Sequence, residues 1–207
     1  MATENYTTYD ADTDPNERFT VAAAKITITG LLNNEDAYVY ADKGASHFGP
    51  TFTHDLETKT TASVSGKFIA WAVTNFIDDF NGGCWAGAGT GLGVFYEQGT
   101  KLWLLNGDGN LSDSWASATL GTLYYITVER TSETAVVERI YTDAARTVLA
   151  DTLAVSVTNG QRFQYVYGAQ SWNSGTDSSV SGYVENLDLN EAAAGHVPYN
   201  LILQGAA

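Results

Sequence analysis

The stretch GGCWAGAGTGLG at residues 82–93 contains Cys84, the only cysteine of the chain, directly before Trp85. A cysteine acts as a nucleophile when a helix N-terminus or a cationic neighbour lowers the pKa of its thiol and a histidine pairs with it. Glycines occupy every second position from 87 to 93, and each costs a helix about 1 kcal/mol relative to alanine. We therefore expect no helix here, and the pattern favours a glycine-rich turn between two strands over a catalytic thiol.

The same glycines do not make a phosphate-binding loop. Their spacing, G-x-G-x-G-x-G, differs from the dinucleotide motif G-x-G-x-x-G, and the following VFYEQ (94–98) has the character of a strand rather than a helix. Ten basic residues face 24 acidic ones, which gives a formal net charge of −14. Such a charge opposes binding to nucleic acid and to anionic lipid, so we expect neither partner and no membrane contact.

Two carboxylates, Asp55 and Glu57, share one face of the predicted strand at 51–63. A retaining glycoside hydrolase needs such a pair about 5–5.5 Å apart. A third carboxylate in step is missing, and a charged ladder on a solvated strand explains the pair more simply. We expect a protein without catalytic residues and keep a glycoside hydrolase centred on this pair as an alternative.

Oxygen ligands of the kind that calcium takes occur in NFIDDFNGG, as Asp78 and Asp79, and in NGDGN, as Asp108. None of these segments has the spacing of an EF-hand loop, and Asp-Asp and Asp-Gly are also ordinary turn residues. We expect no cofactor and name Asp78 and Asp79 as candidates should calcium bind. His47 and His54 could be zinc ligands, but a core or rim histidine is the simpler interpretation of His54.

Aromatic side chains on loops suit carbohydrate, because their faces stack on sugar rings while short amides and carboxylates hold the hydroxyl groups. Trp71 and Trp103 lie in apolar strands and are expected in the core. The candidate ligand-binding residues are Trp85, Asp108, Asn110, Trp115, Trp172 and Asn173.

Period-2 alternation of apolar and polar residues dominates the chain, as in KITITG (25–30) and AYVYAD (37–42). About a dozen short strands separated by Gly, Asn and Asp turns predict an all-β, two-sheet antiparallel β-sandwich. The predicted domain spans 1–190. A tail at 191–207 breaks the pattern and is expected to pack loosely or to contact a partner.

The predicted last strand, SGYVENLDLNEA, resembles the closing strand of LamG-like, concanavalin A-type jelly-roll domains. The matching residues are Gly182, Val184, Glu185, Asn186, Leu187 and Leu189. The segment LYYITVERTSETAVVERIYTDAARTVLADTLAV resembles paired strands of the same family, and the resemblance covers most of 16–190. It implies a jelly-roll β-sandwich and specifies a fold rather than a chemistry. Val184, Leu187 and Leu189 are expected to be buried.

The whole chain also resembles stand-alone domains of tailed-phage and environmental virus particles. The segments that carry this resemblance are Tyr6–Tyr9, Asp14–Asn16, Asn34–Gly44 and Ser181–Leu189. It implies a non-catalytic glycan-binding or adhesion module on a virion surface, with host polysaccharide and other virion proteins as partners. A capsid decoration or fibre domain without sugar binding is the structural alternative, and a homo-oligomer is compatible with either.

The polar, acidic start MATENYTTYDADTDPNE has neither the basic region nor the apolar core of a secretory signal. We therefore expect synthesis in the cytoplasm and release by lysis, which fits a virion protein.

Overall fold

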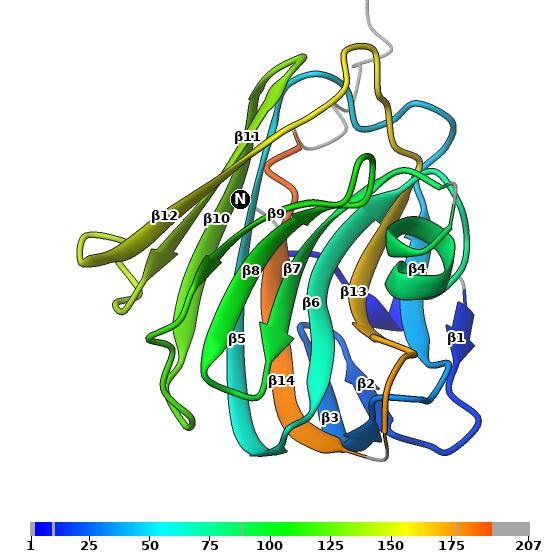
Figure 1. The fold of residues 1–207 in the computed structure, drawn as a ribbon, viewed down its shortest axis with the longest axis vertical. Helices are drawn as coiled ribbons and strands as arrows, with labels where there is room; N and C mark the ends of the chain where they lie inside the picture. The colour runs from blue at the N-terminus through cyan, green and yellow to red at the C-terminus, as the bar shows by residue number, and fades with distance from the viewer. Residues whose placement is uncertain (1–2, 10, 88, 177, 192–207) are drawn as a thin grey trace, which may run out of the picture.

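The computed structural model describes residues 3–9, 11–87, 89–176 and 178–191. Fourteen strands form two seven-stranded antiparallel sheets that pack face to face (Figure 1), which confirms the predicted sandwich. In spatial order, sheet A contains β1 (Ala11–Thr13), β4 (Tyr38–Asp42), β13 (Tyr165–Ser171), β6 (Lys67–Thr74), β7 (Gly91–Glu97), β8 (Lys101–Asn106) and β9 (Leu111–Trp115). Sheet B contains β12 (Leu149–Ser156), β11 (Ala135–Tyr141), β10 (Tyr124–Ser132), β5 (Phe52–Val64), β14 (Ser179–Asp188), β3 (Lys25–Leu32) and β2 (Phe19–Ala22).

The closing strand β14 lies inside sheet B, between β3 and β5. Val184, Leu187 and Leu189 are buried in the core between the sheets, which confirms the prediction for all three. A register shift after Glu185 leaves Asn186 with a φ of 54°. Such a β-bulge changes the alternation by one residue, so side chains three positions apart can face the same core.

The two outer faces of the sandwich differ in character. Along β5, His54, Leu56 and Thr58 point into the core, whereas Asp55 and Glu57 face outward with the polar residues of the neighbouring strands. The outer face of sheet A is instead apolar and carries a second buried cluster. Its members are Ile69, Ala72, Phe80, Cys84, Phe95, Leu105, Tyr167 and Trp172.

The connection between β6 and β7, described for residues 75–87 and 89–90, folds back over the outer face of sheet A (Figure 1). We call this segment the plug. It contains the single-turn helix η2 (Asn81–Trp85), and the other helix of the described residues is the single turn η1 (Tyr6–Thr8). No helix in the described part of the chain is long and apolar enough to cross a membrane. The predicted tail lies outside the described residues from position 192 on.

Candidate functional site

Glycines in β7 and in the turn after β8 let the plug contact the sheet closely. A Cβ atom at Gly107 would lie 1.9 Å from the Cys84 sulfur, and a Cβ atom at Gly93 would lie 3.0 Å from the ring of Phe80. Burial raises the pKa of the Cys84 thiol to about 12, and the nearby Asp108 carboxylate adds to the increase. The thiol is therefore protonated at neutral pH, which supports a structural role for Cys84 over a nucleophilic one.

The expectation that no helical turn forms at Cys84 is wrong. The Ala86 N–H donates to the Asn81 carbonyl at 2.7 Å, and the Gly83 N–H donates to the Asp79 carbonyl at 2.9 Å. The Asp79 carboxylate also accepts from the Gly82 N–H at 2.6 Å. These bonds satisfy backbone groups locally, so a single wide turn forms despite the low helix propensity of glycine.

Tyrosines line one side of the plug, and we call Tyr38, Tyr40, Tyr165 and Tyr167 the tyrosine flank. Tyr40 packs edge-to-face on Tyr165 with ring centroids 5.8 Å apart, and Tyr38 packs in the same way on Tyr167 at 5.9 Å. The Tyr167 hydroxyl donates to the Phe76 carbonyl at 3.1 Å, which ties the tyrosine flank to the plug. A hollow of about 550 Å³ opens here, lined by Tyr40, Asp42, Lys43, Gly44, Ile77 and Tyr165.

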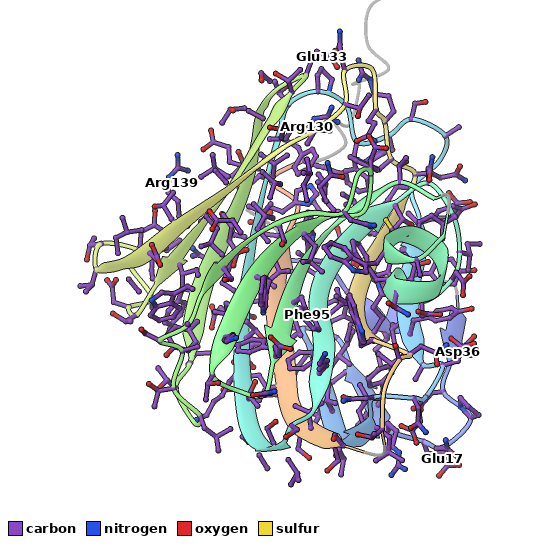
Figure 2. The ribbon with its side chains drawn as sticks, in the orientation of Figure 1. Glu17, Asp36, Phe95, Arg130, Glu133 and Arg139 are labelled. Atoms are coloured by element: carbon purple, nitrogen blue, oxygen red, sulfur yellow. The ribbon has the colours of Figure 1, made fainter. Side chains whose placement is uncertain are left out.

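Other aromatic residues gather on the opposite side, and we call Trp85, Phe95, Trp103 and Trp172 the tryptophan flank. Phe95 lies over the middle of sheet A on the side facing the viewer (Figure 2), with the Trp172 ring 4.5 Å from it. Trp85 reaches from the plug to within 6.1 Å of Trp172. Trp103 is the cross-strand partner of Phe95. Trp85 and Trp103 are partly exposed, while Trp172 is only 9% exposed.

Lysines and a glutamate border the tryptophan flank. The Lys67 ammonium lies 6.0 Å from the centre of the Trp172 ring, and that of Lys101 lies 5.6 Å from the centre of the Trp103 ring. Both ammonium groups also contact the Glu97 carboxylate, at 3.3 and 3.8 Å. The Glu97 carboxylate therefore already compensates the positive charge of both lysines.

An acidic trio, Asp36, Asp78 and Asp79, lies where the plug meets the start of β4. One carboxylate oxygen from each lies within 4.8 Å of the others, and Figure 2 shows Asp36 below the coiled part of the plug. Burial raises the pKa of Asp79, which also accepts a bond from the Asn173 amide at 3.0 Å. Calcium takes six to eight oxygen ligands, so the trio would supply only part of a calcium site.

The structure distributes the predicted ligand-binding residues over three places. Trp85, Trp172 and Asn173 come together beside Asp79. Asp108 and Asn110 lie in the turn between β8 and β9, where Asp108 accepts a bond from the Thr158 hydroxyl.

Trp115 is not displayed on a loop, which corrects the expectation for this residue. It belongs to β9 and packs edge-to-face on the ring of Tyr124, with the ring centroids 5.4 Å apart. Trp172 is also more buried than expected, because its ring covers Phe95. Trp71 is buried in the core as predicted, whereas Trp103 lies on the outer face of sheet A and is only partly buried.

The tyrosine flank and Asp36 are the parts of this surface that the sequence analysis missed. The alternation in AYVYAD places Tyr38 and Tyr40 on one face, but it does not reveal which face lies outside the sandwich. Three strands, β4, β5 and β6, separate Asp36 from Asp78 in the sequence, and only the sheet topology brings the two carboxylates together.

Asp55 and Glu57, the candidate hydrolase pair, lie on the outer face of sheet B rather than in this site. Asp55 already accepts bonds from the Thr127 hydroxyl and, at 3.0 Å, from the Asn190 amide, and Arg146 lies 3.3 Å away. These contacts explain the Asp55 carboxylate as part of a surface network.

Solved structures with a similar fold include three carbohydrate- or receptor-related proteins. Trypanosoma rangeli sialidase gives a TM-score of 0.54 at 12% identity, over 82% of this chain and 26% of that chain. The receptor-binding domain of botulinum neurotoxin D gives 0.54 at 7% identity, over 88% of this chain and 44% of that one. A variant of alginate lyase A1-II′ gives a TM-score of 0.51 at 15% identity, over 84% of this chain and 83% of that chain.

This chain thus spans about a quarter of the sialidase and less than half of the neurotoxin structure. No family model matches the sequence, and no curated protein matches it. At such identities the likeness concerns the fold alone. The chain is an all-β sandwich with a concanavalin A-like fold, an architecture that often binds carbohydrate.

Proposed function

We propose that the outer face of sheet A binds neutral carbohydrate without cleaving it. The observation that carries this proposal is a set of partly exposed aromatic rings around a hollow of about 550 Å³. They lie on the outer face of a sheet, where polar side chains are usual. Exposed apolar patches rimmed by polar groups mark interaction sites, and ligand pockets span about 300–1,000 Å³. The outer face of sheet B differs, because it carries carboxylates and cations rather than an aromatic cluster.

Sugars suit such a surface, because one face of a pyranose ring is apolar while its edge carries hydroxyl groups. Tyr40 and Tyr165 offer ring faces and edges in the hollow, and the Asp42 carboxylate and the Lys43 ammonium lie at its border. The Lys43 ammonium is already paired with Glu4 at 2.8 Å. A net charge of −14 adds repulsion against acidic polysaccharides, so the proposal is restricted to neutral ligands.

The proposal of binding without cleavage is supported by the surroundings of two candidate catalytic groups. The Cys84 thiol is buried with a raised pKa, and the Asp55 carboxylate is engaged in a surface network. Two of the three candidate catalytic groups of the sequence, Cys84 and Asp55, therefore have a structural explanation.

The setting that we propose is the surface of a virus particle. It is supported by the sequence resemblance of Tyr6–Tyr9 and Asn34–Gly44 to phage and virus proteins. Mass spectrometry of purified particles would test it, and absence of the chain from them would contradict the setting while leaving carbohydrate binding open to its own test.

A glycan array tests the binding itself. We expect signals from neutral glycans, and substitution of Tyr40→Ala or Tyr165→Ala, both in the hollow, should reduce them at least tenfold, which corresponds to about 1.4 kcal/mol. Tyr125→Ala is the matched control, because this partly buried tyrosine lies on the outer face of sheet B. Equal loss in the control and the site variants, or an array without any signal, would contradict the proposal.

A further inference from the structure

We infer that the plug restricts this surface to the ends of carbohydrate chains, so that the ligand is a short terminal segment rather than the middle of an unbranched polysaccharide. The inference rests on the proposed function. It follows from where the plug lies, from how firmly the plug is held, and from the shape of the hollow beside it.

The plug lies across a row of residues that crosses the strands on the outer face of sheet A. The row spans five strands and consists of Tyr40, Tyr167, Ala72, Gly93 and Leu105. Phe80 of the plug packs on this row over Gly93. A polymer that followed the row from Tyr40 across the strands would therefore collide with the plug.

Contacts along its length hold the plug on the sheet. The Tyr167 hydroxyl donates to the Phe76 carbonyl at 3.1 Å and accepts from the Asp78 N–H at 3.2 Å. Further along, the Asn173 amide donates to Asp79. Cys84 is buried against the backbone of Gly107, so displacement of the plug would expose an apolar cluster to water.

The hollow beside the plug is lined by residues of the plug as well as of the sheet. Ile77 of the plug is one of them and is 45% exposed. Tyr40, Lys43 and Tyr165 line it from the side of the sheet, and Lys43 is paired with Glu4. A hollow of this size suits a sugar or two at the end of a chain, and we expect Ile77 to obstruct a chain that continues toward the plug.

The test asks whether the amount of protein bound follows the number of chain ends or the length of the chains. The probe is the neutral glycan with the strongest array signal, used as its oligosaccharides from the monosaccharide to the hexasaccharide and as its unbranched polymer. We expect the affinity per mole of chain to stop rising after the first few sugars. Partial hydrolysis of the polymer should raise the amount of protein bound per gram in proportion to the number of new ends.

Ile77→Ala tests this obstruction directly, because it shortens an exposed side chain without touching the core. We expect this variant to gain binding to the intact polymer relative to the oligosaccharides, while Val64→Ala, at a more exposed apolar position at the end of β5, leaves the ratio unchanged. Binding that follows polymer mass regardless of hydrolysis would overturn the inference while supporting the proposed function. An array without signals would overturn both.

Discussion

Gly107 and Cys84 are in direct contact: a Cβ atom on Gly107 would lie 1.9 Å from the Cys84 sulfur and 2.9 Å from its Cβ. This contact joins the turn after β8 to the plug, and no side chain larger than hydrogen fits there. Glycine at position 107 thus allows the backbone of this turn to lie against a buried thiol.

Gly107→Ala is therefore expected to force the plug away from the sheet and to lower stability by about 1–3 kcal/mol, the usual range for overpacking. The measurements are thermal unfolding and the rate at which a thiol reagent labels Cys84, which should increase. Gly49→Ala is the control, because a Cβ atom there meets no atom within 4 Å. An unchanged labelling rate in Gly107→Ala would show that the plug does not depend on this contact.

Trp115→Ala is expected to lower the stability of the protein without weakening glycan binding. Its ring packs on Tyr124 beside the core and away from the plug. The sequence alone predicts the opposite result, because the polar neighbours of Trp115 suggest a displayed side chain. Thermal unfolding and array binding of the same preparation distinguish a stabilising role of Trp115 from a role in binding. Weaker binding at an unchanged melting temperature would support the role in binding and contradict this prediction.

Alternation along single strands predicted the sandwich, because it depends on the local period of apolar residues, and the resemblance to jelly-roll domains led to the prediction that Val184 is buried. Alternation could not predict that the outer face of sheet A is covered, since it separates two faces without stating what lies on each. Trp103 shows the consequence: an apolar strand suggested the core, yet its ring lies on the outer face. The meeting of Asp36 with Asp78 likewise depends on topology rather than on spacing.

Substitution of His54 should change the response of the protein to acid. The imidazole is buried among Phe48, Phe52 and Trp71, with ring centroids 4.5–5.4 Å away, and burial lowers its pKa to about 3. The unfolded chain takes up a proton near pH 6.5 while the folded protein does not, so stability should fall as the pH falls from 6.5 toward 3.

His54→Phe should remove the part of this acid sensitivity that comes from the imidazole. Urea unfolding across this pH range measures it, with His47→Gln as the control on a partly exposed histidine that contacts Glu191. The same pH slope in His54→Phe and in the parent would contradict the assignment.

Glu138 should make the protein less stable as the pH rises from the acidic range toward pH 8. Val136, Glu138 and Ile140 share the inward face of β11, so this carboxylic acid lies in the core, fully buried. Neither of its oxygens has a hydrogen-bond partner among the described residues. Burial, with a smaller contribution from the Asp113 carboxylate, raises its pKa from 4.5 to about 8.

The folded protein thus retains a proton that the unfolded chain releases above pH 4.5, so the free energy of unfolding should fall between about pH 4.5 and pH 8. Each unit of pKa difference corresponds to about 1.4 kcal/mol, which makes the expected loss a few kcal/mol. Glu138→Gln keeps the shape of the protonated acid and cannot ionise, so its stability should vary less over this range. Glu57→Gln, on the outer face of sheet B, is the matched control. An unaltered slope in Glu138→Gln would mean that the carboxyl group ionises without cost and that water reaches this part of the core.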